Sequence, residues 1–427
     1  MSQHSRGLRP SLVAAAAMLA LSAQASSLVG FASMQADTFS HGPTSGQFVS
    51  SANGVTLPLV DKQPVQGFSA VLFGKQPGTF DVMPDNGFGN KASSPDALLR
   101  MYTLRPEFRT WNGSERVGAG SVVPVQRKTG VAQPSFDRES TITLHDPDHL
   151  LGFARVADGA TYPYAGSGPG SAGIPVDKSI RKRSLLTGGD LDIESVRRDK
   201  NGHLWFGDEF GPFLVKTDNQ GKVLRAEVPM AGVMSPSNPY LNGATPTLNN
   251  SSGFEGMAIN PAGDTLYTLL EGTVVGDAAK SLRINAFSVD SEAYTGQQWL
   301  YKLDTNGTNI GDMTAVNDHQ FLVIERNGYC EGSACFKKIF LIDLSVVDAE
   351  GYVGKTEVAD LMNLADPHDL NLDGKDIFTF PFVTIEDVLV LDANTILVMN
   401  DNNYPGSSRD AGVPDPNEFL MIKLDQP

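Results

Sequence analysis

The sequence predicts an all-β fold, a single β-propeller, and three observations support this prediction. A two-part motif recurs along the chain: an acidic residue begins a short apolar strand, and a second strand ends in another acid. The chain holds 43 glycines and 26 prolines among 427 residues, which favours tight turns over long helices. Turns such as Asp199–Gly202 and Asn260–Asp264 separate the paired strands, as in antiparallel hairpins.

The spacing of the motif predicts the number of blades. Intervals of 61, 57 and 74 residues separate the acids that begin four first strands: Glu194, Glu255, Asp312 and Glu386. A weaker copy begins at Gln66, 128 residues before Glu194, which leaves room for one further unit within 105–165. Repeated units of four short antiparallel strands are typical of propeller blades, whereas a β-sandwich does not explain the recurring acids. We expect six blades in 66–427, with seven left open.

The first 25 residues have the composition of an export signal. Arg6 and Arg9 precede an apolar run over 12–21, and Ala23-Gln24-Ala25 follows as a small-residue cleavage site. The apolar run is too short to span a bilayer, so we expect no stable membrane insertion. We expect cleavage after Ala25 and a periplasmic or secreted protein. Residues 26–65 are a polar lead-in segment, in which one closing strand is possible.

The net charge and the cysteine content limit the kinds of molecule that the protein can bind and the compartment in which it works. The net charge of −16 argues against nucleic-acid binding. We expect a monomer that takes a small-molecule ester or phosphoester substrate. The two cysteines, Cys330 and Cys335, are expected to form a short disulfide loop in an oxidising compartment. Free thiols and a metal site are the alternatives for this pair.

The recurring acids point to one place in a propeller. The first strand of each blade lines the central channel, so residues at the same phase of these strands face one another. Crowded carboxylates need compensation, and Ca²⁺ or another hard divalent cation accepts six to eight oxygen ligands. Seven histidines and two cysteines disfavour zinc and copper. The candidate metal ligands lie at the strand ends: Asp192, Glu194, Asp208, Asp312, Glu325, Glu386, Asn400 and Asp401. Glu209 and Glu271 also end second strands.

Several motifs carry a resemblance to a known family. They are Leu186–Ser195 with Leu204–Phe213, the pair Glu325-Arg326, and Phe380–Val388 with Asn400–Ser407. Together they resemble the bacterial phytase-like propeller proteins, labelled "esterase-like activity of phytase", over roughly 66–427. The resemblance implies an exported propeller related to calcium-dependent phytases and, more distantly, to gluconolactonase-like propellers with a channel metal. Dedicated propeller phytases hold inositol phosphates with a dense Lys/Arg cluster, which this sequence lacks.

The combined hypothesis is an exported Ca²⁺-dependent phosphoesterase or esterase-like hydrolase. A cation at the channel mouth would polarise a phosphoryl or ester oxygen and lower the pKa of a bound water. Glu255 or Glu209 would act as general base, and Arg326 or Arg283 would neutralise developing charge. Two alternatives remain: a non-catalytic propeller whose channel metal is structural and whose face binds a ligand or protein partner, and a lactonase-like hydrolase.

Overall fold

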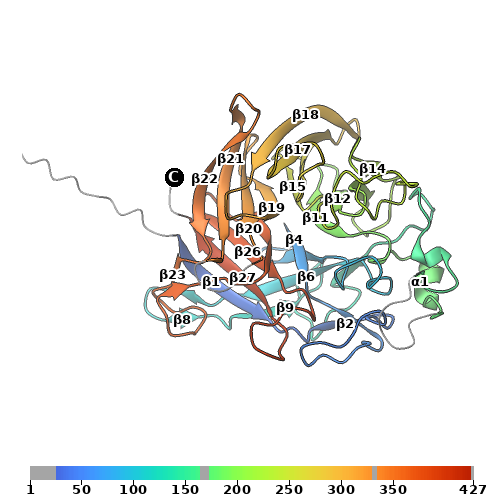
Figure 1. Cartoon of the computed structure of the whole chain (residues 1–427). Helices are drawn as coiled ribbons and strands as arrows, with labels where there is room; N and C mark the ends of the chain where they lie inside the picture. The colour runs from blue at the N-terminus through green and yellow to red at the C-terminus, as the bar shows by residue number, and fades with distance from the viewer. Residues whose placement is uncertain (1–25, 164–172, 329–333, 425–427) are drawn as a thin grey trace, which may run out of the picture.

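The computed structural model describes residues 26–163, 173–328 and 334–424, and β-strands dominate it (Figure 1). Three sheets have four strands each, and every strand is antiparallel to its neighbour. The strands of these sheets, in pairing order, are β11 (Ile193–Arg198), β12 (Leu204–Asp208), β13 (Phe213–Thr217) and β14 (Val228–Pro229); β15 (Gly256–Ile259), β16 (Thr265–Leu269), β17 (Ser281–Ser288) and β18 (Ala293–Lys302); β19 (Asn309–Ala315), β20 (Gln320–Arg326), β21 (Lys337–Val347) and β22 (Val353–Asp360).

Two further units of the same kind are joined into one larger sheet. The last unit pairs β25 (Thr384–Val390), β26 (Thr395–Asp401), β27 (Asn417–Lys423) and the N-terminal strand β1 (Ser27–Met34). The other pairs β4 (Phe68–Phe73), β5 (Phe80–Pro84) and β6 (Arg100–Glu107), with both β9 (Ser121–Pro124) and β10 (Thr141–Thr143) on β6. Bridges from β1 at Ser33 to Ser121 and at Phe31 to Arg109 link the two units. A strand near the N-terminus thus completes the C-terminal sheet.

The first strands of these units close a ring. Along the ring, β4 contacts β11, β11 contacts β15, β15 contacts β19, β19 contacts β25, and β25 contacts β4. One hydrophobic cluster lies between each pair of neighbouring units, for example Trp205 and Phe254 between the sheets of β11 and β15. The all-β class and the propeller-like arrangement are therefore confirmed, and Figure 1 shows the inner strands around a common centre.

The prediction of six blades is not confirmed, because the described strands form five units. Residues 105–165, where a further unit was expected, contribute no first strand in the part of the chain that is described. They form short peripheral elements: the pair β7 (Thr110–Trp111) and β8 (Arg116–Val117), strands β9 and β10, and the 3₁₀ turn η1 (Val156–Asp158). This stretch is an insertion that adds peripheral strands to the unit of β4, β5 and β6, and it does not form a sixth unit.

A few small elements lie outside the ring. They are the pairs β2 (Phe39–His41) with β3 (Lys62–Pro64) and β23 (Leu364–Ala365) with β24 (Ile377–Phe378), and the helix α1 (Lys178–Arg183). The side chain of Asp177 caps α1 by accepting a hydrogen bond from the Ser179 N–H. None of the helices in the described residues has the length and apolar character needed to cross a membrane.

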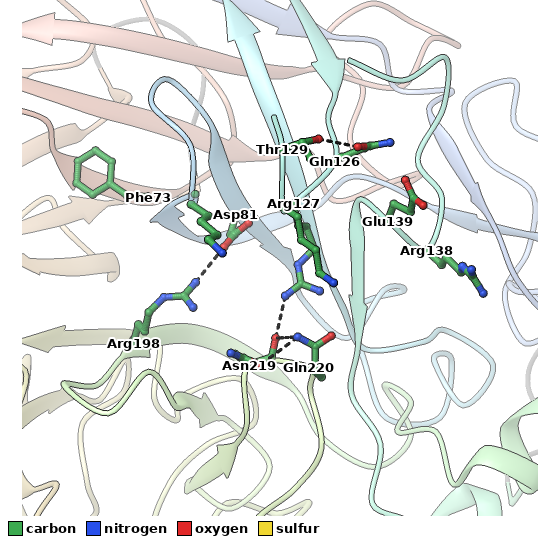
Figure 2. Close-up of a pocket in the computed structure, with 13 residues that line it drawn as sticks. Phe73, Asp81, Gln126, Arg127, Thr129, Arg138, Glu139, Arg198, Asn219 and Gln220 are labelled. Atoms are coloured by element: carbon green, nitrogen blue, oxygen red, sulfur yellow. Dashed lines mark hydrogen bonds and ion pairs between the residues drawn. The ribbon is translucent and has the colours of Figure 1, made fainter. Parts of the chain in front are cut away.

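The two ends of the inner strands differ in charge. Asp192 and Glu194 lie at the start of β11, and at the far ends of β4 and β11 Phe73 and Arg198 line a cavity together with further cations (Figure 2). Arg198 lies four positions after Glu194, so the two ends of β11 are about 13 Å apart at the usual rise of a strand. The acidic end contains most of the residues that the sequence motifs selected.

Candidate active site at the acidic end of the ring

The first strands carry equivalent side chains at this end, and β-bulges set their direction. The pairing shifts within β4, β11, β19 and β25, after the first or second paired residue at the acidic end. A bulge leaves its extra residue out of the ladder and re-aims that side chain. Glu255 holds the corresponding place directly before β15. We name the five equivalent residues the first-strand tier: Ser69, Glu194, Glu255, Gly311 and Glu386.

The second strands contribute a matching set. Ile193 pairs with Asp208 and Ile385 with Asn400, so the next residues, Glu209 and Asp401, lie opposite Asp192 and Thr384, one position outside these pairs. The backbone N–H of Glu209 donates to the Asp192 carbonyl, and the N–H of Glu271 donates in the same way one sheet further on. We name this set the second-strand tier: Asp85, Glu209, Glu271, Arg326 and Asp401. Seven of the ten residues in the two tiers are therefore carboxylic acids.

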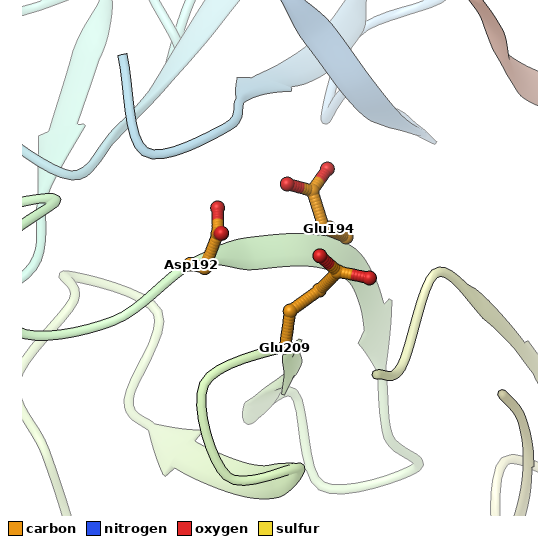
Figure 3. Close-up of side chains that lie close together, drawn as sticks. All are labelled: Asp192, Glu194 and Glu209. Atoms are coloured by element: carbon orange, nitrogen blue, oxygen red, sulfur yellow. The ribbon is translucent and has the colours of Figure 1, made fainter. Parts of the chain in front are cut away.

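Asp192, Glu194 and Glu209 form the first acidic triad. One oxygen from each lies within 4.8 Å of the others, and all three side chains are buried. Figure 3 shows their carboxyl groups gathered around the start of β11. Asn86 donates to Asp192 at 2.6 Å, and the Gly253 N–H donates to Glu209 at 2.9 Å. Among the described residues, no Lys, Arg or His forms an ion pair with this triad.

A second triad shares Glu209 and includes Glu255 and Glu271, again with oxygens within 4.8 Å. In this triad the positive charge comes from a side chain of the protein, Arg326. Arg326 Nη2 lies 2.7 Å from Glu386, 3.3 Å from Glu255 and 3.4 Å from Glu271. Its Nε is buried without a hydrogen-bond partner among the described residues. Arg326 therefore neutralises one side of the site and retains a donor.

Burial is the main reason that every carboxyl group in the tiers has a raised pKa. It raises the pKa of Asp401 to about 8 and that of Glu271 to about 7. For Glu194 burial comes first and the charges of Asp192 and Glu255 add to it, so its pKa lies well above the usual range. For Arg326 burial favours a lower pKa, but Glu386, Glu271 and Glu255 outweigh it and raise the pKa. These carboxyl groups therefore favour bound protons when no cation joins them.

The structure brings together seven of the residues that the sequence selected. They are the proposed ligands Asp192, Glu194, Glu386 and Asp401, and the proposed catalytic residues Glu209, Glu255 and Arg326. Glu386 also accepts a hydrogen bond from Ser69 at 3.2 Å. Asp401 is coupled electrostatically to Glu386 and Arg326.

Three other proposed ligands take part in local structure. Asp208 accepts hydrogen bonds from the backbone N–H groups of Asp192 and Gly211, which shapes the loop after β12. Glu325 contacts Lys355 at 2.6 Å and accepts from Tyr301 at 2.5 Å. Asn400 bridges the backbone of β26 and β27. None of these contacts reaches the tiers.

Asp312 and Arg283 also lie away from the triads. Asp312 forms a buried ion pair with Arg197 at 2.9 Å and accepts from the backbone N–H groups of Met313 and Val388. It therefore joins three first strands through their interior. Arg283, proposed as a catalytic cation, pairs with Asp277 at 2.7 Å on the third strand of its sheet. The disulfide prediction involves Cys330, which lies outside the described residues.

Two acidic members of the site were given no role from the sequence. Burial, and then the charges of Asp401 and Asp192, raise the pKa of Asp85 well above the usual range. Glu271 lies in the second triad. Alignment of the second-strand ends Pro84-Asp85, Asp208-Glu209, Leu270-Glu271, Glu325-Arg326 and Asn400-Asp401 is the signal that identifies both.

The donor set fits a hard divalent cation. The first triad offers only carboxylate oxygens, and Asp85 adds another nearby carboxyl group. Oxygen-only donors suit Ca²⁺, whereas the absence of His and Cys from both triads does not suit zinc. Asp192, Glu194 and Glu209 are the residues that would hold the ion, because Arg326 already compensates the other triad.

Comparison with known proteins gives one family. A model of the family described as "Phytase-like: Esterase-like activity of phytase" matches residues 63–404. An uncharacterized secreted protein from Arthroderma benhamiae is 26% identical over 185 residues. That alignment covers 38% of this chain and 30% of the relative, so it spans less than a third of the relative's length.

Solved structures show weaker likeness. The periplasmic gluconolactonase of Pseudomonas aeruginosa is 13% identical, with 93% of this chain and 100% of that chain covered and a TM-score of 0.34. The calcium-binding protein regucalcin from Agrobacterium tumefaciens is 10% identical, with 93% and 97% covered and a TM-score of 0.35. Both scores are below 0.5, so neither likeness supports an argument about the reaction.

Proposed function

The chain belongs to the phytase-like family, esterase-like activity of phytase, and we propose that it is an exported Ca²⁺-dependent hydrolase of ester bonds. The observation that carries this proposal is the first acidic triad. Three buried carboxylates lie within 4.8 Å of one another and have no cationic partner among the described residues. Like charges at this separation are stable only when protonated or when a cation joins them.

Different residues around the triad have different roles in the proposed reaction. When bound by Asp192, Glu194 and Glu209, Ca²⁺ supplies Lewis-acid polarisation and lowers the pKa of water. Glu255, next to Glu209 in the second triad, takes the proton of the attacking water. Burial raises its pKa well above the usual range, which makes it a stronger base than an exposed carboxylate. Arg326 stabilises the negative charge that develops on the substrate.

A cavity beside the tiers indicates the substrate class. It has a volume of about 420 Å³, and Asp85 and Asp401 form part of its wall. Phe88 and Tyr404 supply aromatic surface, and none of the described residues that line it is Lys or Arg. A polyanion such as an inositol polyphosphate would find no counter-charge there. We therefore propose a neutral or singly charged ester, and the same cavity supports a lactone as the second candidate.

Glu194→Gln tests the metal and the reaction together. The substitution keeps size and removes one negative ligand, so we expect the purified variant to lose at least about tenfold in Ca²⁺ affinity. Turnover on carboxyl esters, lactones and phosphomonoesters should fall in parallel, and chelation of the wild type should abolish it. Metal analysis and an ester screen with and without Ca²⁺ measure both effects. Glu357→Gln makes the same chemical change on the surface strand β22 and should alter neither.

The outcomes separate this proposal from its main alternative. A non-catalytic propeller with a structural metal predicts that Ca²⁺ raises the melting temperature while no ester, lactone or phosphoester is hydrolysed. Full turnover in chelator would contradict the metal-dependent mechanism. Cleavage of lactones without cleavage of open esters would select the second candidate.

Export and assembly complete the proposal. The predicted signal lies in residues 1–25, outside the described part of the chain, and the Arthroderma relative is described as secreted. We propose that the protein acts in the periplasm or outside the cell as a monomer, without nucleic-acid or membrane partners. N-terminal sequencing of the exported protein tests cleavage after Ala25.

A further inference from the structure

A second cavity lies at the opposite end of the inner strands. Its volume is about 770 Å³, and its walls come from the far ends of β4 and β11, the start of β5, and the segment after β9 (Figure 2). Phe73 and Arg198 end β4 and β11, while Ser69 and Glu194 of the first-strand tier lie near the starts of these strands. The two sites are therefore separate, about 13 Å apart along a strand.

The charge of this cavity is opposite to that of the whole molecule. Five cations line it, Lys75, Arg127, Lys128, Arg138 and Arg198, against two acids, Asp81 and Glu139. The chain as a whole has a net charge of −16. Within the described residues, only Arg198 among the five has a carboxylate within 4.0 Å, and that partner is Asp81 at 3.0 Å. The cavity thus concentrates cations that the protein does not neutralise.

The two central guanidinium groups are held in place. Arg127 donates from Nη2 to the Asn219 carbonyl at 2.8 Å, and its backbone N–H donates to the Glu139 carbonyl. Asp81 accepts from Thr103 at 2.6 Å and from Arg198 at 3.0 Å. Burial lowers the pKa of Arg127, Asp81 opposes this effect, and the charge of Arg198 lowers it further. Two fixed guanidinium groups therefore lie near one carboxylate, which pairs directly with Arg198 alone, and an added anion would relieve their repulsion.

Phe73 adds apolar surface beside the cations. Its ring stacks on Phe80 with centroids 6.0 Å apart, yet 53% of the residue stays exposed at the cavity. A bare inorganic ion would not use this surface, whereas an anion with an apolar or aromatic group would. Guanidinium groups bind phosphate, phosphonate and carboxylate oxygens in pairs.

We propose that this cavity binds a small organic anion, a phosphate or carboxylate that carries an apolar group. The site is independent of the acidic tiers and needs no metal ion. Arg127 and Arg198 bind the anionic head, the exposed Lys75 and Arg138 add long-range attraction, and Phe73 packs on the apolar group.

Titration calorimetry with phenylphosphonate and inorganic phosphate, in chelator, tests the proposal. Phenylphosphonate has no hydrolysable ester and does not depend on the reaction proposed above. We expect it to bind more tightly than phosphate and less tightly at high salt. Arg127→Gln should weaken both ligands about tenfold, the usual value of one charge-assisted contact. Phe73→Ala should weaken phenylphosphonate alone, to the level of phosphate.

The double variant Lys75→Gln/Arg138→Gln tests the cavity without changing a residue that the fold needs. Both side chains are exposed and form no ion pair in the described structure. It should weaken both ligands and reduce their salt dependence. Lys182→Gln on α1 removes the same kind of charge outside the cavity and should leave binding unchanged. Equal binding in wild type, Arg127→Gln and the double variant, or no binding to the wild type, would overturn the proposal. Because none of these residues belongs to the tiers, failure here would leave the proposed hydrolase activity standing.

Discussion

At the residue scale, Arg326 decides how the acidic site can exist without a metal ion. It is the one cation in the two tiers, and its guanidinium group lies within 3.4 Å of three buried glutamates. Buried charges are tolerated when paired, and removal of one partner leaves the others uncompensated. The same residue keeps the second triad from needing a metal, which leaves Asp192, Glu194 and Glu209 as the ligands.

Arg326→Gln should therefore destabilise the protein strongly. At about pH 8 in chelator we expect a loss of about 3 kcal/mol in the free energy of unfolding, since Glu255, Glu271 and Glu386 lose their counter-ion. Urea denaturation measures it. Arg283→Gln is the matched control, because its partly exposed pair with Asp277 is worth at most about 1 kcal/mol. Equal losses in both variants would show that Arg326 does not compensate the cluster.

The choice between neighbouring residues limited the sequence-based prediction. Adjacent side chains of a strand point to opposite faces. An error of one position therefore assigns to the channel a residue whose side chain lies elsewhere in the sheet. Asp208, Glu325 and Asn400 were selected as ligands, but the residues that reach the site are the next ones. Glu209, Arg326 and Asp401 had also been recognised, because the motifs contain both neighbours. Only the bulges and strand register in the structure decide which neighbour enters the channel.

At the element scale, close contact between first strands brings the tiers together. Gly311 occupies the position that Glu194 and Glu386 hold in other units, and it lies against β25. A Cβ atom on Gly311 would stand 2.0 Å from the Ile385 carbonyl oxygen. No side chain fits between β19 and β25 at this level, so the glycine permits Glu386 to approach Arg326.

Gly311→Ala should force the two strands apart. Overpacking of this kind costs about 3 kcal/mol, and a displaced Glu386 should also change the site. Thermal unfolding and Ca²⁺ affinity report the two effects. Gly354→Ala lies on the outer strand β22, where the nearest contact to a new Cβ is a backbone oxygen at 4.0 Å. It should change stability by less than about 1 kcal/mol. Unchanged stability in Gly311→Ala would mean that β19 and β25 adjust freely.

At the scale of the whole molecule, sequence spacing predicted the architecture better than the number of units. Each recognised copy of the motif forms a first and a second strand, and the turns after Arg198 and Ile259 join them as expected. The interval of 128 residues before Glu194 was divided into two units, although it holds one unit and an insertion. Average spacing cannot distinguish a missing copy from an insertion, whereas five inter-sheet clusters and a closed ring can.

The acidic tiers and the neighbouring Asp192 should make the stability of the whole ring depend on pH and Ca²⁺ together. Burial raises the pKa of Asp192 to about 6, that of Glu271 to about 7 and that of Asp401 to about 8. Unfolding returns each carboxyl group to a pKa near 4, so between about pH 4 and pH 8 the folded state holds more protons than the unfolded state. The stabilising effect of these protons is complete below about pH 4 and is lost as the pH rises through the folded pKa values.

In chelator, the melting temperature should therefore fall as the pH rises from about 5 to about 8, because deprotonated carboxylates then repel one another. Ca²⁺ binds the deprotonated groups, so the increase in melting temperature that it causes should grow over the same range. Glu194→Gln should flatten both trends, and Glu357→Gln should leave them as in the wild type. Scanning calorimetry at several pH values, with chelator and with excess Ca²⁺, measures these trends. A melting temperature in chelator that rises steadily from pH 5 to pH 8 would contradict the claim that the tiers are protonated when empty, because the ring would then be most stable with its carboxylates charged.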